Sequence, residues 1–220
     1  LSCRPNAPLQ LSTVDLLAAT QTPLDASESP LQLAPGQTLS GYRRKDISQL
    51  QTSLSQTFDQ VLGASQMAIQ GEVAMVQVGG LESRNVARYG RDPLYGAGNL
   101  PGNACVKRNA QQLNAAGAGL NNVSRYCSGD GFVTSTAWGY RTRAVWEYPQ
   151  VLPHLTLKPA LAWSQDVAGY APDGQFNEGA KAASIGLNAE YQNVYRASLS
   201  YSSFFGGDFN TLADRDFLLF

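Results

Sequence analysis

The side chains best suited to chemistry lie in the stretch TAWGYRTRAVWEY, residues 136–148, where Arg141 and Arg143 are followed by Glu147. Successive side chains of a β-strand point to opposite faces. A strand would therefore place these three charged residues on one face and the aromatic residues on the other. At helical spacing the two kinds would mix around the cylinder, which disfavours a helix. The stretch predicts a strand whose aromatic face meets either a protein core or lipid.

Other segments repeat this alternation, and together they predict about seven strands. They are residues 47–58, 65–78, 131–148, 155–168, 180–192, 195–205 and the closing RDFLLF at 215–220. The charged residues fall on the polar face of their own strand: Glu72, Arg141, Arg143, Glu147, Lys158, Asp166, Glu190 and Arg196. Lys181, at a strand end, is the exception. Chance would give each residue even odds of either face, so we infer a common surface that is kept free of charge.

The composition favours a membrane barrel over a soluble nucleic-acid-binding protein. Only 15% of the 220 residues are charged and the formal net charge is -1, whereas a typical charged fraction is about 25%. Nothing in this balance points to nucleic acid. No run approaches the roughly 20 apolar residues of a membrane helix. Dispersed apolar residues and few charges are typical of transmembrane β-barrels.

The connections between the predicted strands alternate in length. Short links span 58–65, 148–155 and 192–195, and longer glycine-rich links span 78–131, 168–180 and 205–215. Short periplasmic turns and long outer loops are characteristic of outer-membrane barrels. We therefore predict an all-β, antiparallel transmembrane β-barrel of the outer-membrane type. Residues 1–46 are expected to form a strand end and an outer loop, and 47–220 the C-terminal barrel strands with a long outer loop at 79–130.

Aromatic residues occur at two levels of the predicted apolar face. Those near the short turns are Trp146, Tyr148, Tyr191 and Tyr195, and those farther along are Trp138, Trp163 and Tyr201. At about 3.3 Å per residue the two levels lie roughly 15–20 Å apart, which approaches the ~25 Å band between the aromatic girdles of such barrels. We predict that these aromatics face the lipid interface and that the eight charged residues face the lumen. Their signs balance, which favours internal ion-pair networks over a ladder of substrate contacts.

Cysteine and histidine suggest structure rather than catalysis. Cys105 and Cys127 could close a loop of about twenty residues, contributing ~3 kcal/mol, against the alternative of unrelated thiols. Cys3 is left over as a free thiol or the partner of a missing cysteine. The lone His154 lies in a predicted turn with no nucleophile nearby, and no metal or cofactor is expected. Arg43, Arg44 and Lys45 form either an anion site for lipopolysaccharide phosphate or a solvated loop tip.

Three longer motifs resemble a known family. They are LAPGQTLSGYRRKD at 33–46, LTLKPALAWSQDVAGYAP at 155–172 and FFGGDFNTLADRDF at 204–217. Over residues 5–217 the chain resembles the C-terminal part of the proteobacterial outer-membrane family called domain of unknown function 1302. Genes of this family tend to lie near those of lipid-associated exporters of the resistance-nodulation type and of a partner family of soluble periplasmic proteins. The resemblance therefore implies movement of a hydrophobic compound through the outer membrane.

The chain departs from that family in two ways. Its first half is absent, and RDFLLF is shorter than the roughly 9–11 residues that a strand needs to cross. With no initiator methionine or signal peptide before Leu1, we expect a C-terminal fragment that pairs with a missing N-terminal half. A short capped helix at 12–19 and another short helix within 109–122 are further expectations.

These features together predict a non-enzymatic channel or conduit for a hydrophobic or amphipathic compound in the outer membrane of a Gram-negative bacterium. Its expected partners are outer-membrane lipid, the N-terminal half and a soluble periplasmic protein, without nucleic acid. One rival is a structural barrel that docks a periplasmic partner and conducts nothing. An outer-membrane lipid-modifying enzyme is a second rival, which the isolated His154 disfavours.

Overall fold

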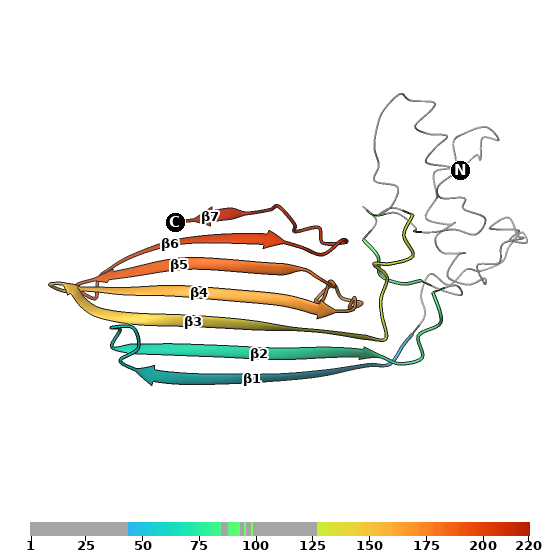
Figure 1. The fold of residues 1–220 in the computed structure, drawn as a ribbon, viewed down its shortest axis with the longest axis horizontal. Coiled ribbons are helices and arrows are strands. Elements are labelled where there is room, and N and C mark those ends of the chain that lie inside the picture. Colours follow the sequence, from blue (N-terminus) through green and yellow to red (C-terminus); the bar gives the residue numbers. More distant parts are fainter. Residues whose placement is uncertain (1–43, 85–87, 93–94, 96–97, 99–126) are drawn as a thin grey trace, which may run out of the picture. The chain divides into compact units, whose positions relative to one another are not determined.

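The computed structural model describes residues 44–84, 88–92, 95, 98 and 127–220 (Figure 1). The chain divides into two compact units, one formed by residues 1–46 and 80–133 and the other by residues 47–79 and 134–220. The second unit contains every described strand. Among the described residues, no helix has the length and apolar character needed to cross a membrane.

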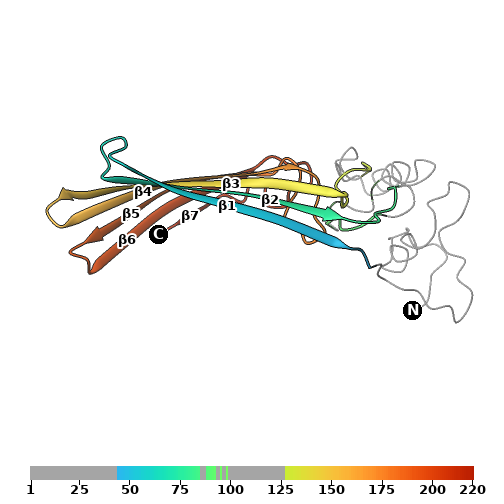
Figure 2. The same ribbon diagram turned by 90° about the horizontal axis from the view of Figure 1, so that it is seen from below.

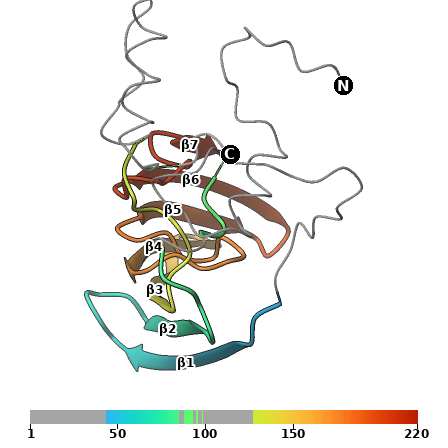
Figure 3. The same ribbon diagram turned by 90° about the vertical axis from the view of Figure 1, so that its right-hand side faces the viewer.

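The second unit is one antiparallel sheet whose seven strands lie side by side in chain order (Figure 1). The strands are β1 (Ile47–Asp59), β2 (Gln66–Val78), β3 (Thr136–Leu152), β4 (Leu155–Ala168), β5 (Lys181–Tyr191), β6 (Tyr195–Phe205) and β7 (Phe217–Leu219). The prediction of an all-β, antiparallel chain with about seven strands is confirmed. Figures 2 and 3 show a single twisted layer.

The predicted bounds of β3 were wrong at both ends. The strand begins at Thr136, five residues after the predicted start, because the amide of Val133 instead donates to the carbonyl of Tyr89 within the first unit. It ends at Leu152 because Pro153 and His154 alone form the turn to β4, with His154 at φ 64°. The ladder therefore continues to the pair Leu152–Leu155, beyond a register shift that follows Tyr148.

Short and long connections alternate along the sheet. Turns 60–65, 153–154 and 192–194 lie together at one end (Figure 1). The longer segments 79–135, 169–180 and 206–216 follow the opposite ends of their strands. Gln192 and Asn193 both have positive φ, at 55° and 57°, as the two central residues of a tight hairpin turn require. In an antiparallel sheet whose strands follow chain order, successive connections lie at alternate ends. The short turns therefore share one end of the sheet and the long connections share the other.

The two edges of the sheet differ in length. β1 has 13 residues and pairs only with β2, whereas β7 has three residues and pairs only with β6. β1 and β7 do not pair with each other, so the described strands form an open sheet. An edge strand leaves a row of amide and carbonyl groups without ladder partners. The outer edge of β1 is therefore available to another strand.

Candidate functional site: the charged face of the sheet

The strand register gathers the eight charged residues named from the sequence on one face, here called the charged face. Glu72 lies directly opposite Arg141 on the neighbouring strand, and Glu190 lies directly opposite Arg196. The other four reach the same face by alternation from these pairs: Arg143, Glu147, Lys158 and Asp166. The opposite side of the sheet, here called the apolar face, carries Lys181 at the end of β5.

Two ion pairs lie toward the short turns of the charged face. Lys158 Nζ is 3.5 Å from Glu147 Oε1, and an Arg196 nitrogen is 3.2 Å from Glu190 Oε1. The side chain of Arg196 is 78% exposed and that of Glu147 is 40% exposed. Each pair is therefore worth at most about 1 kcal/mol. They are two separate cross-strand contacts, rather than one continuous network.

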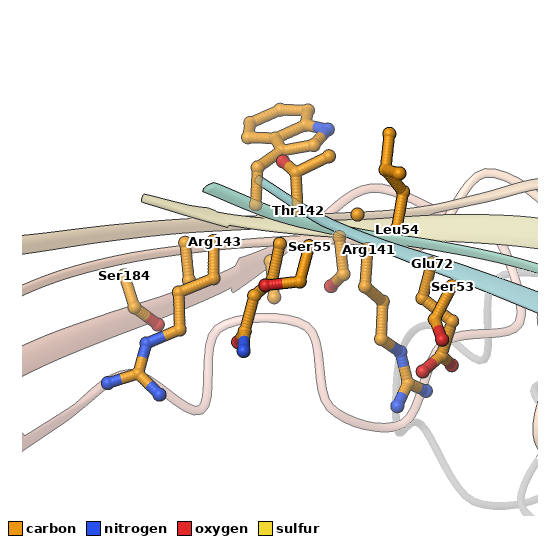
Figure 4. A pocket seen from close by; sticks show the side chains of 14 residues that line it. Ser53, Leu54, Ser55, Glu72, Arg141, Thr142, Arg143 and Ser184 are labelled. Atoms are coloured by element: carbon orange, nitrogen blue, oxygen red, sulfur yellow. The ribbon is translucent and has the colours of Figure 1, made fainter. Parts of the chain in front are cut away.

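Arg141 has acidic neighbours near the opposite ends of the strands. It is the direct cross-strand partner of Glu72, and Figure 4 shows the two side chains extending on the same side of the sheet. On its other side the charge of Arg141 also acts on the carboxylate of Asp166. The positively charged side chain of Arg141 therefore lies between the carboxylates of Glu72 and Asp166.

The segment 169–180 folds over the charged face beside this group. Asp166 Oδ2 accepts a hydrogen bond of 2.9 Å from the backbone amide of Asn177, and Glu178 Oε2 accepts one of 2.8 Å from Gly169. Phe176 is only 6% exposed. A Cβ added at Gly139 would lie 3.1 Å from the ring of Phe176. The missing side chain of Gly139 thus makes room for this ring.

A second contact joins segment 169–180 to the connection before β7. The side-chain amide of Asn177 donates to the carbonyl of Phe209 at 2.6 Å. The rings of Tyr170 and Phe209 meet edge to face with centroids 5.9 Å apart. Sequence reasoning treated 169–180 only as an outer loop and missed its inward fold. The available signal was Gly139, which interrupts the alternation on the side that carries Asp166.

Arg143 occupies a different environment from Arg141. Its direct cross-strand neighbours are Gln70 on β2 and Ala162 on β4. Among the described residues, no hydrogen bond or ion pair involves its side chain. Both arginines, Ser55 and Ser184 lie here on the charged face (Figure 4). They line a hollow of about 450 Å3, whose lining also includes Leu54, Thr142 and Trp163 of the apolar face. The guanidinium of Arg143 is thus an exposed donor group beside neutral hydroxyls.

The apolar face carries all seven aromatic residues predicted for the lipid interface. They are Trp138, Trp146, Tyr148, Trp163, Tyr191, Tyr195 and Tyr201. Large aliphatic side chains between them are exposed, including Leu54 at 72% and Ile185 at 59%. Figure 4 shows Leu54 on the side of the sheet opposite Arg141. No layer of the second unit covers these side chains, so the sheet presents apolar surface outward.

Some polar atoms on the apolar face have partners there. Trp163 Nε1 donates to the hydroxyl of Tyr140 at 3.3 Å, and that hydroxyl donates to Gln165 Oε1 at 3.1 Å. Trp146 differs, because its covered Nε1 has no hydrogen-bond partner among the described residues. The usual reason for tryptophan at an interface is an indole N–H that reaches water or a head group. The geometry of Trp146 does not provide that contact.

Asp216 brings a carboxylate to the apolar face, a feature that the charge pattern missed. Its Oδ2 accepts a hydrogen bond of 2.6 Å from the hydroxyl of Tyr201, and its Oδ1 accepts one of 2.9 Å from the amide of Phe204. These bonds, the Tyr201 contact first, hold the pKa of Asp216 below its usual range. The carboxylate anchors the chain just before β7.

The remaining sequence predictions fall mostly outside the described residues. Cys3, Cys105, Arg43 and the expected helices at 12–19 and 109–122 lie there, so the Cys105–Cys127 pairing stays a prediction. Lys45 forms an ion pair of 2.7 Å with Glu82, which counts against an anion site at this lysine. His154 is exposed in its turn. Within the described part of the chain, no cluster of side chains suited to a metal occurs.

The fold and the face thus define an all-β protein with one open antiparallel sheet, charged on one side and apolar on the other. A family model described as "Protein of unknown function (DUF1302)" matches residues 1–220, and the chain belongs to this family. This confirms the resemblance drawn from its motifs. No curated protein matches the chain. No solved structure matches it.

Proposed function

We propose that the sheet is part of an outer-membrane β-barrel that serves as a conduit for a hydrophobic or amphipathic compound. The observation that carries the proposal is the exposed apolar face, which spans β1 to β6 with Lys181 at its edge and Asp216 beside β7. Soluble monomers rarely expose an apolar patch of this extent to water, and such patches mark contacts with lipid or with another protein. In the outer membrane this face meets hydrocarbon and the charged face lines the lumen.

The lengths of the strands support a crossing. β1 and β2 have 13 residues each, β3 has 17, β4 has 14, and β5 and β6 have 11. A tilted strand needs about 9–11 residues to cross the hydrocarbon. Six strands are therefore long enough, with short turns at one end and long connections at the other, as in outer-membrane barrels.

A barrel in lipid must also be closed, since each unpaired backbone group in hydrocarbon costs several kcal/mol. The 13-residue outer edge of β1 therefore needs a partner strand. Further strands of the barrel supply that partner, and they complete the wall that the short β7 leaves open. A soluble periplasmic protein that delivers or receives the compound would bind at the end of the short turns.

The lumen proposed here is lined mainly by neutral polar residues and balanced charge. The segment 169–180 narrows it near Asp166 because Phe176 covers part of the charged face. Such a lining has no strong ring of one sign, so simple ion selectivity is not its expected property. A conduit for a molecule with a polar head and an apolar body fits this mixture better.

The test uses the full-length protein reconstituted in liposomes with a nitrobenzoxadiazole-labelled phospholipid in both leaflets. Dithionite quenches only the outer leaflet of vesicles that exclude it, so transfer by the protein appears as quenching beyond about half of the signal. Quenching of a soluble nitrobenzoxadiazole dye trapped inside the vesicles is measured in parallel, to subtract entry of dithionite through the lumen. We expect increased quenching relative to protein-free vesicles. Intact insertion without any increase would reject the conduit and favour a barrel that only docks a partner. Vesicles containing an unrelated outer-membrane barrel are the control.

A further inference from the structure

On the charged face, the row of directly paired residues that contains Arg143 has only one charged member among the described strands. The row runs Ser55, Gln70, Arg143, Ala162, Ser184, Ser202 and Phe217. The hydroxyls of Ser184 and Ser202 lie 2.7 Å apart. A guanidinium carries five N–H donors and no acceptor. The other members of the row provide neutral hydroxyl groups and one amide, and none of them is a carboxylate.

The neighbouring row toward the short turns has a different character. It runs Thr57, Ala68, Val145, Ala160, Gly186, Ser200 and Leu219. Four consecutive strands contribute only small or apolar residues to it, from Ala68 to Gly186. A short apolar strip thus lies on the charged face directly beside the guanidinium of Arg143.

The contrast with Arg141 shows that this placement is particular to Arg143. Both arginines lie on β3 and line the same hollow. Arg141 faces Glu72 across the ladder and acts on Asp166, whereas Arg143 faces Gln70 and Ala162. Neither arginine makes a hydrogen bond or ion pair among the described residues. The difference between them is that Arg141 has a carboxylate directly across the ladder, whereas Arg143 has a neutral amide and an alanine.

We propose that Arg143 binds the carboxylate head of an amphipathic compound while the Ala68–Gly186 strip holds the first part of its apolar tail. A planar guanidinium and a carboxylate form two parallel hydrogen bonds. One cation among neutral hydroxyls matches a single negative charge. This assignment rests on the proposed conduit, to which it adds a head-group class and a specificity-determining residue.

The test compares octanoate with octanamide, which share one chain length and differ in head-group charge. Binding is measured by calorimetry on the full-length protein in a nonionic detergent, with empty micelles subtracted. We expect wild-type protein to prefer octanoate. Arg143→Gln should weaken octanoate binding by about tenfold, as the loss of a charge-assisted hydrogen bond predicts, and should leave octanamide binding unchanged. Arg143→Lys should restore part of the preference.

Arg141→Gln is the matched control. Its effect on octanoate should be less than about twofold, since Arg141 faces Glu72 and does not adjoin the Ala68–Gly186 strip, and interactions between exposed charges are weak. Equal loss of both ligands in Arg143→Gln, or no preference in the wild type, would overturn the assignment. So would an equal loss of octanoate in Arg141→Gln. A protein that moves no lipid but loses octanoate through Arg143→Gln would retain the carboxylate site and reject the conduit alone.

Discussion

The assignment of the two faces makes a sharp prediction at adjacent positions of β3. Ala144 lies on the apolar face at the centre of this 17-residue strand, paired with Ile69 and Leu161. Val145 lies on the charged face between Ala68 and Ala160. Arginine at either position adds the same side chain to the same strand. The substitutions therefore differ mainly in the medium that the guanidinium meets.

The expected magnitude follows from the depth of Ala144. It lies four residues from Tyr148, or about 13 Å along the strand at about 3.3 Å per residue. Trp138 lies beyond it in the other direction on the same face. A position between the two aromatic levels is near the middle of the membrane, where arginine costs about 2–4 kcal/mol. Both cross-strand partners are exposed apolar residues, Ile69 at 37% and Leu161 at 49%, so they offer no polar group to an arginine.

Val145→Arg should be milder, with a cost below about 1 kcal/mol. The small partners Ala68 and Ala160 leave room for the new side chain. Glu147 follows two residues later on the same face and can interact with it. The new charge would also lie beside Arg143, so the two effects partly cancel. In addition, the lumen proposed for this face would hydrate the guanidinium.

The assay is equilibrium unfolding of the full-length protein from phosphatidylcholine vesicles in guanidinium chloride, followed by tryptophan fluorescence. Ala144→Leu controls for bulk and should be close to neutral. Equal free-energy losses for the two arginine variants would refute the face assignment, because a soluble two-sided sheet has no such asymmetry. A larger loss at Val145 would invert it and place the charged face against lipid.

Four shorter predictions concern the connections, the register and the cysteines. Gly139→Ala should speed hydrogen exchange in 169–180, because the new methyl would lie 2.7 Å from the Gln165 carbonyl oxygen and 3.1 Å from the ring of Phe176, which belongs to that segment. Gly71→Ala is the control and should not change this exchange, since its methyl meets nothing within 4 Å. The pKa of Asp216 is lowered in the fold, so its stabilisation of β7 is present above a usual carboxyl pKa near 4 and lost as pH falls through the lowered value. The protection factors of the β7 amides, which correct for the pH dependence of intrinsic exchange, should therefore fall with acid, and Asp216→Asn should remove that pH step. Oxidation should cross-link the double variant Glu72→Cys with Arg141→Cys, but not Glu72→Cys with Arg143→Cys, if the β2–β3 register holds. Mass mapping should find Cys105 joined to Cys127, and free thiols at both would contradict that pairing.

Alternation was a reliable guide wherever a strand ran between clear turns. β4 and β6 have the bounds that the pattern predicts, 155–168 and 195–205. The signal is strong there because short polar turns, such as 192–194, stop the period-two pattern abruptly. β3 was less well predicted, since its start depends on which unit holds Val133. Its end was also placed too early, because the strand continues through Pro149 to Leu152 with a shift in register after Tyr148. The ends of β3 thus depend on hydrogen bonds to residues distant in the sequence, which a local sequence pattern does not show.

The inward fold of 169–180 lay beyond sequence reasoning for the same reason. Nothing within the segment says that Asn177 will donate to Asp166, because the carboxylate lies eleven residues earlier on a strand. The partner of Phe176 is a missing side chain at Gly139 on β3. The space left by Gly139 predicts a contact with Phe176 only once β3, β4 and segment 169–180 have been placed together. Composition could mark 169–180 as a connection, but it could not say where the connection lies.

The difference between the two arginines depends on register rather than on facing. Alternation places Arg141 and Arg143 on one face whatever the pairing of β2 with β3. A slip of two residues would keep every side chain on its face, yet it would set Glu72 opposite Arg143 and leave Arg141 without that partner. In the observed register Glu72 instead pairs with Arg141. This register is set across the long connection 79–135 rather than by a tight turn. A charge pattern read from the sequence therefore establishes a polar surface, whereas a binding site on that surface depends on which rows the assembled sheet brings into line.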